Sequence, residues 1–100
     1  MIYITQLIFV KAGKEEAFLE FESHALPLMA EHGGTLLYRL RPDEHSFVHA
    51  TGELPYEIHV IAFESQEALD RFLQDDRRQA FLPLKESSIS STLLVKGQRM

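Results

Sequence analysis

Four short segments of the chain are rich in β-branched and aromatic residues, the composition that β-strands favour. These segments are Ile2–Val10, Thr35–Arg41, Glu57–Phe63 and Ile89–Val95. Successive side chains of a strand point to opposite faces of its sheet, so the order of residues assigns each one to a face. The segment Glu57–Phe63 carries apolar residues on both faces, which predicts a central strand that is covered on both sides.

A longer segment between the first two strands has the apolar spacing of an amphipathic helix. This helix is expected to run from Lys14 to about His32, with its apolar stripe turned towards the sheet. Pro27 lies inside it and is expected to bend or shorten it, because proline lacks a backbone donor. Gly33 and Gly34 follow, and glycine readily adopts the left-handed conformation that ends a helix.

The segment Tyr56–Leu84 predicts the central strand, an amphipathic helix and a second, short helix. Ser65 stands where an N-cap residue belongs, since its hydroxyl can accept a hydrogen bond from the first helical turn. Asp76 and Gln79 have the spacing of a capping box, which predicts that a new helix begins there. Pro83 is expected to limit this second helix.

The connection between the second strand and the central strand has turn chemistry. Pro42 is followed by Asp43, and proline favours the second position of a type I turn. The apolar residues that come next predict a short return strand at Phe47–Thr51, which would complete a hairpin.

The expected order of elements is strand, helix, strand, strand, helix, strand, with the short hairpin return. Right-handed crossovers then give a ferredoxin-like α+β fold, a single domain over residues 1–100 with the helices on one face of the sheet. The other face would expose apolar side chains, so we expect a homodimer in which a second copy covers it, a dimeric α/β barrel. Seven residues are expected to be buried: Ile2, Ile4, Phe21, Ile58, Val60, Leu69 and Phe72.

Composition and charge exclude several classes of function. The net charge of −5 argues against a nucleic-acid partner, because such partners require a basic surface. The chain contains no cysteine, so it has no disulfide and no thiolate metal ligand. Its longest apolar run is too short for a bilayer, and its first residues lack the features of a signal peptide. We therefore expect a cytoplasmic protein that binds neither nucleic acid nor membrane.

Several motifs, in their order along the chain, resemble one uncharacterised family. They are HGG at 32–34, TLLYRL, a strand that ends in FES at 63–65, EALDRFLQDDRRQAFLPL, and a final LLVKG. The family is the domain of unknown function number thirteen-thirty, within the dimeric α/β-barrel superfamily. The resemblance spans nearly the whole chain. It implies a homodimer with a pocket between helices and sheet, but no agreed activity and no agreed catalytic residues.

The segment ESQEALDRFLQ is also similar to relatives of the antibiotic-biosynthesis monooxygenases. Haem-degrading members of that group place a histidine on this helix. Residues 65–82 of this chain contain no histidine, which argues against haem, and no other cofactor is predicted.

Three polar residues, Gln6, Arg39 and His59, lie on strands that are otherwise largely apolar. If the central strand pairs with both the first and the second strand, their side chains project to one side together. His59 would then act as a general base towards an acidic small molecule, with Arg39 fixing its carboxylate. The alternative is a structural role, with His59 and Arg39 hydrogen-bonded inside the dimer interface to Glu57 or another carboxylate.

A second candidate base is His24, beside the apolar stripe of the first helix, where the alternative is a core histidine with satisfied hydrogen bonds. His45 and His49 would lie roughly 13 Å apart in a strand, too far for one ion, so no metal site is predicted. The candidate substrate-binding residues are Gln6, Phe21, Tyr38 and Arg39.

Two functions of different classes follow from these residues. The first is a small-molecule binder that holds a hydrophobic or acidic molecule in a pocket between helices and sheet. The second is a cofactor-independent monooxygenase or isomerase that acts on an aromatic or hydrophobic acid, with His59 or His24 as the base and Arg39 as the anion anchor. A pocket that contains a histidine with a perturbed pKa beside an arginine would favour the enzyme.

Overall fold

The computed structural model describes residues 1–100 as four strands, three α-helices and one short 3₁₀-helix. The elements are β1 (Ile2–Val10), α1 (Glu15–Glu31), β2 (Gly34–Leu40), η1 (Glu44–Ser46), β3 (Glu57–Phe63), α2 (Gln66–Gln74), α3 (Asp76–Ser88) and β4 (Ile89–Gly97). The strands form one antiparallel sheet in the order β2-β3-β1-β4. This confirms the expected ferredoxin-like α+β fold and the expected pairing of β3 with both β1 and β2.

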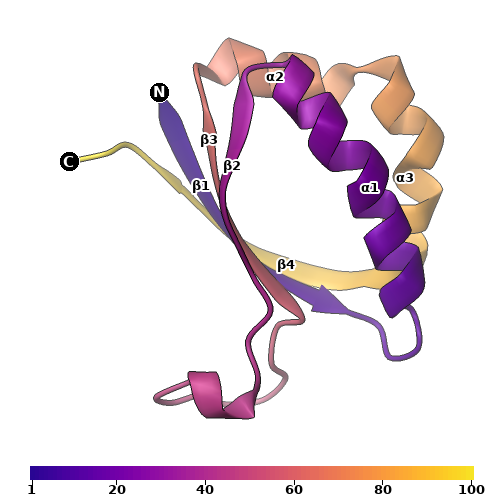
Figure 1. Ribbon diagram of the computed structural model, residues 1–100, viewed down its shortest axis with the longest axis vertical. Helices are drawn as coiled ribbons and strands as arrows, with labels where there is room; N and C mark the ends of the chain where they lie inside the picture. Colours follow the sequence, from indigo (N-terminus) through magenta and orange to yellow (C-terminus); the bar gives the residue numbers. More distant parts are fainter.

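The helices form a single layer on one side of the sheet (Figure 1). α3 packs chiefly on α1, so these two helices share the layer that faces the sheet. No element of the chain covers the opposite side of the sheet, and we call that side the bare face (Figure 1). The segment between β2 and β3, which contains η1, extends away from the two layers.

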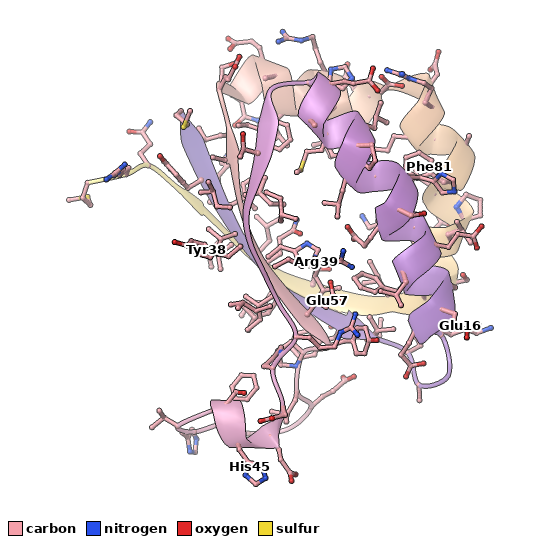
Figure 2. All side chains as sticks on the ribbon, viewed as in Figure 1. Glu16, Tyr38, Arg39, His45, Glu57 and Phe81 are labelled. Atoms are coloured by element: carbon pink, nitrogen blue, oxygen red, sulfur yellow. The ribbon has the colours of Figure 1, made fainter.

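A β-bulge in β2 decides which side chains of this strand face the helices. The register against β3 shifts between Leu36 and Tyr38, so that Leu37 is an extra residue. Such a bulge changes the side-chain alternation beyond it. Arg39 therefore pairs with His59 and lies between sheet and helices, whereas Tyr38 points to the bare face (Figure 2).

The hydrophobic core lies between the sheet and the helices. Its central cluster consists of Ile4, Met29, Ile61, Phe63 and Ala68. Gly34 begins β2 where the chain leaves α1, and it lies so close to this cluster that an added Cβ would approach Met29 Cγ to 2.5 Å and the Phe63 ring to 2.8 Å. Glycine at this position therefore lets the second strand pack directly against the end of the helix.

Burial agrees with the sequence expectation only in part, on both sides of the sheet. Ile4 and Phe21 are buried. Ile58 and Val60 lie on the bare face, where a single chain provides no cover. The expected core residues that are only half-buried are Ile2, Ile58, Val60, Leu69 and Phe72.

Two prolines lie inside helices without ending them. α1 continues past Pro27, and α3 continues past Pro83. The prediction that Pro83 limits the second helix is therefore wrong. α3 packs against α1 through contacts such as that between Phe21 and Phe81, whose ring centroids are 5.7 Å apart, and this packing outweighs the loss of one backbone hydrogen bond.

Short polar side chains cap the N-termini of α2 and α3. Ser65 accepts a hydrogen bond from the Ala68 N–H, as expected of an N-cap. The N-cap of α3 is Asp75, which accepts from the Arg77 N–H, so the helix begins at Asp76 and the predicted capping box at that residue is not formed.

The predicted return strand at Phe47–Thr51 is also wrong, because the chain forms η1 at Glu44–Ser46 and then continues through Phe47–Thr51 without regular structure. Asp43 accepts hydrogen bonds from the His45 N–H and the Ser46 hydroxyl, while Ser46 accepts from the Asp43 N–H. These local bonds close a turn directly before the predicted strand, and Phe47–Thr51 pairs with no strand of the sheet.

Replacing Gly34 by alanine tests the close packing at the start of β2. We expect Gly34→Ala to lower the free energy of unfolding by about 1–3 kcal/mol, since its methyl group would overlap core atoms. Denaturant unfolding measures this change. The control is Gly97→Ala in β4, whose added Cβ would meet no atom within 4 Å. Equal stability of the two variants would contradict the packing described here.

Candidate functional site: a cavity beside a buried carboxylate

Three basic side chains contact the carboxylate of Glu57, which lies on the helix side of β3. Arg39 donates to it from Nε (2.8 Å) and Nη2 (3.3 Å), and Arg41 donates from Nη2 (2.6 Å). His59 Nε2 lies 2.9 Å from the same carboxylate. The Glu57 side chain is only 2% exposed, so these partners replace the water that a carboxylate otherwise requires. Figure 2 shows Arg39 and Glu57 in the space between sheet and helices.

The ionisation of Glu57 fixes the role of the His59 ring. Burial by itself raises the pKa of Glu57, but the hydrogen bonds from His59, Arg39 and Arg41 prevail and lower this pKa to about 2. At neutral pH the carboxylate is therefore ionised and only accepts hydrogen bonds. His59 Nε2 must carry the proton of the shared bond, and Nδ1 is left as the ring nitrogen without a partner in the chain.

A cavity of about 290 Å³ lies beside His59, between the helices and the sheet. It has room for about ten water molecules, at roughly 30 Å³ each. Thr92 and Leu94 of the edge strand β4 line it and are exposed, so the cavity reaches solvent along this edge. Its apolar wall includes Ile8, Phe21, Ala25, Leu26, Met29 and Ile61. Its polar lining includes Gln6, Glu22, His59, Arg78 and Lys85.

Glu22 is the acidic group of this cavity. It projects from α1, is 6% exposed and forms no hydrogen bond with another residue. Burial raises the pKa of its carboxyl, and the attraction of His59 and Arg39 offsets this effect only in part. The protonated form of Glu22 is therefore favoured in comparison with an exposed glutamate.

Two cations from α3 line the same cavity. The Nε atom of Arg78 is buried without a hydrogen-bond acceptor, while its guanidinium lies 5.4 Å from the centroid of the Phe72 ring. Burial lowers the pKa of Arg78. Burial, followed by the nearby charge of Arg78, also lowers the pKa of Lys85. Neither cation forms an ion pair, so both are available to an anion that enters the cavity.

The structure brings together part of the candidate set from the sequence. Gln6 and Arg39 flank His59 on neighbouring strands, as expected from the strand order. Gln6, His59 and Phe21 line the cavity. Arg39 lies next to it with its guanidinium bound to Glu57, which is the partner that the structural alternative named, although on the helix side of the sheet and not on the bare face.

Two other candidates lie outside the cavity. His24 is exposed and stacks on Phe81, with ring centroids 5.3 Å apart. Tyr38 is 63% exposed on the bare face (Figure 2). The cavity and the bare face are therefore separate surfaces, on opposite sides of the sheet.

Three charged residues of the cavity were not among the candidate site residues from the sequence: Glu22, Arg78 and Lys85. Arg78 follows Arg77 in a charged segment that is typical of a solvated helix face. Glu22 follows the buried Phe21 on α1. A charged residue next to the apolar stripe is the only feature of the sequence that could have indicated its burial. Lys85 lies beyond Pro83, so its position could be inferred only once α3 was known to continue.

Two further observations concern metals and membranes. No group of three histidine, cysteine, aspartate or glutamate side chains is placed to hold a metal ion. None of the helices combines the length and the apolar character needed to cross a membrane.

Comparison with known proteins supports the fold. No protein-family model matches the chain, and no curated protein matches it in sequence. The resemblance to family thirteen-thirty is therefore not supported by a family model. The solved structures that resemble the chain include several described as NIPSNAP family or NIPSNAP domain proteins.

Three structural neighbours illustrate the likeness. RPA0582 from Rhodopseudomonas palustris, a protein of unknown function, has a TM-score of 0.87 and 11% identity, over 99% of this chain and 82% of that chain. A NIPSNAP family protein from Agrobacterium tumefaciens has a TM-score of 0.77 and 21% identity, over 99% and 92%. An uncharacterized NIPSNAP domain protein from Burkholderia xenovorans has a TM-score of 0.74 and 18% identity, over 100% and 95%. At these identities the likeness shows a shared ferredoxin-like fold.

Glu57 is expected to make stability depend on pH in a defined interval. Its pKa falls from the ordinary 4.5 to about 2 on folding, so between these values the unfolded chain binds more protons than the folded one. The stabilisation by Glu57 is thus complete above about pH 4.5 and is lost as pH falls through 2.

The variant Glu57→Gln measures this contribution. At pH 7 we expect its free energy of unfolding to be about 2–4 kcal/mol lower than that of the parent protein. The reason is that Arg39, Arg41 and His59 lose their negatively charged acceptor. The difference should shrink towards zero near pH 2. Glu53→Gln, at an exposed position, is the control and should leave the curve unchanged. A Glu57→Gln difference that stays constant from pH 7 to pH 2 would show that Glu57 is not the titrating group.

Proposed function

We propose that this protein binds a small carboxylic acid with an apolar body in the cavity beside His59. The observation that carries this proposal is the buried Nε–H of Arg78, which has no acceptor within the chain. A buried donor without an acceptor costs about 1–3 kcal/mol, and most such groups in proteins are satisfied by a partner. A ligand carboxylate would supply that partner.

The rest of the cavity suits the same ligand. Lys85 adds a second positive charge on the same helix, and the facing wall is apolar. Specific small-molecule sites combine such apolar walls with a few polar groups that fix orientation. The volume of about 290 Å³ limits the ligand to a small molecule.

A second function, a cofactor-independent enzyme acting on the same acid, is favoured by one specific observation. Glu57 holds His59 by Nε2, and the other ring nitrogen has no partner in the chain. A carboxylate that orients a histidine in this way is a recurrent arrangement for a general base. Because Arg39 is bound to Glu57, the proposed anion anchor is Arg78 and not Arg39.

We also propose that the protein is a homodimer, formed by the two bare faces. The bare face presents exposed apolar side chains, among them Tyr38, Leu40, Leu93 and Val95, each more than half exposed. The strand residues that point to this face include no charged side chain. A two-fold axis places such a surface against itself, so a neutral, apolar face pairs with a second copy without repulsion between like charges.

Ligand binding is tested with 4-methylpentanoate and its neutral analogue 4-methylpentanamide, by calorimetry or by NMR titration. We expect the acid to bind at least tenfold more tightly than the amide, because only the acid forms charge-assisted hydrogen bonds with Arg78 and Lys85. Arg78→Ala should weaken acid binding about 10- to 100-fold. Arg71→Ala, at an exposed position on α2, should not change it. Equal affinity for acid and amide would contradict the proposed function.

Dimer formation is tested by the mass of the protein in solution. We expect light scattering to give twice the 11.5 kDa of one chain at micromolar concentration. Leu93→Glu should return the mass to that of a single chain, since it places two carboxylates in the apolar interface. Val48→Glu, at a fully exposed position outside the bare face, is the control and should stay dimeric. A wild-type mass of one chain would exclude the bare-face dimer.

A further inference from the structure

We infer that His59 and Glu22 form an acid–base pair that moves a proton within a small oxo acid bound in the cavity. This inference rests on the proposed function, because the oxo acid must first bind beside Arg78 and Lys85. It goes further in naming the reaction, a keto–enol proton transfer, and the class of substrate, a carboxylic acid with a carbonyl group next to a C–H bond.

The base of the pair is the Nδ1 atom of His59. His59 is only 1% exposed, and it lines the cavity. Its Nε2–H donates to the ionised Glu57 at 2.9 Å, so in the neutral ring the lone pair is on Nδ1. When Nδ1 takes a proton, the resulting imidazolium is stabilised by the carboxylate already bound to it.

The acid of the pair is the carboxyl group of Glu22. It approaches the cavity from α1, on the helix layer, while His59 approaches from the sheet. It is buried and has no hydrogen-bond partner within the chain, so its proton is not engaged by another residue and can be donated to a ligand in the cavity. The same burial raises the pKa of Glu22, which favours the protonated form that a general acid requires.

The cations of α3 orient the substrate between these two groups. A carboxylate bound to Arg78 and Lys85 would lie at the helix side of the cavity, and the apolar wall would hold the remaining carbon chain. Fixed binding of the acid end places the neighbouring carbonyl and its C–H bond in the space that Glu22 and His59 share.

The proton transfer balances without an oxidant or a metal ion. His59 Nδ1 takes the proton from the carbon next to the carbonyl, and the C–H electron pair becomes the carbon–carbon double bond of the enol. The carbonyl electron pair moves to oxygen, which takes the proton of the Glu22 carboxyl. The step leaves an imidazolium and a carboxylate, and its reversal returns a proton from His59 to carbon and a proton from the enol to Glu22.

Hydrogen–deuterium exchange in heavy water tests this inference. The probe is 4-methyl-2-oxopentanoate, whose signal for the carbon-bound protons beside the carbonyl is followed by proton NMR. We expect the protein to accelerate loss of this signal, and His59→Gln and Glu22→Gln each to slow it by about 10²–10⁴-fold. Shifts of the probe signals in the same samples report binding, which both variants should retain within a few-fold.

The matched controls are His45→Gln and Glu16→Gln, whose side chains are exposed and lie away from the cavity (Figure 2). Both should exchange the probe at the wild-type rate. Binding without accelerated exchange would overturn the acid–base pair and leave the proposed function intact. Absence of both binding and exchange would overturn the two together. Exchange that survives in Glu22→Gln and His59→Gln would assign the chemistry to other groups.

Discussion

The buried carboxylate of Glu57 is the interaction on which the rest of the site depends. A charge that is 2% exposed is stable only when donors replace its water. Arg39 of β2, Arg41 just after β2 and His59 of β3 do so. The same bonds tie β2 to β3 and fix the orientation of the His59 ring. Without Glu57, nothing in the chain would determine the tautomer of His59. With Glu57 bound to Nε2, the free ring nitrogen is Nδ1.

The β-bulge at Leu37 makes this arrangement compatible with an apolar bare face. Beyond the bulge, Arg39 faces the helices while Tyr38 and Leu40 face the opposite side. Charged groups are thereby concentrated between the layers, and neutral groups remain on the surface proposed for the dimer. The fold thus separates two surfaces with different chemistry: the cavity proposed to bind a small acid and the bare face proposed to pair with a second copy of the chain.

Much of this organisation could be predicted from the sequence. The limits of Ile2–Val10 and Glu57–Phe63 agree with the structure because strand composition and flanking residues mark them clearly. The strand order also predicts that Gln6, His59 and Arg39 lie side by side on neighbouring strands. Lys85 could not be predicted in the same way, since α3 was expected to be limited at Pro83 and tertiary packing overrides that local signal. Glu22 and Arg78 lie before Pro83, and their place in the cavity depends on how the helices pack. The return strand was predicted wrongly because its apolar pattern is short: Asp43 and Ser46 close a turn directly before Phe47, and Phe47–Thr51 then pairs with no strand.

The most direct test of the role of Glu57 is the tautomer of His59, measured from the nitrogen chemical shifts of its ring in the wild-type protein at a pH where the ring is neutral. We predict a proton on Nε2 and a lone pair on Nδ1, because the ionised Glu57 only accepts hydrogen bonds. In Glu57→Gln this preference should weaken. A wild-type ring with its proton on Nδ1 would contradict the account, since Glu57 would then not orient His59 and the cavity would lack its base.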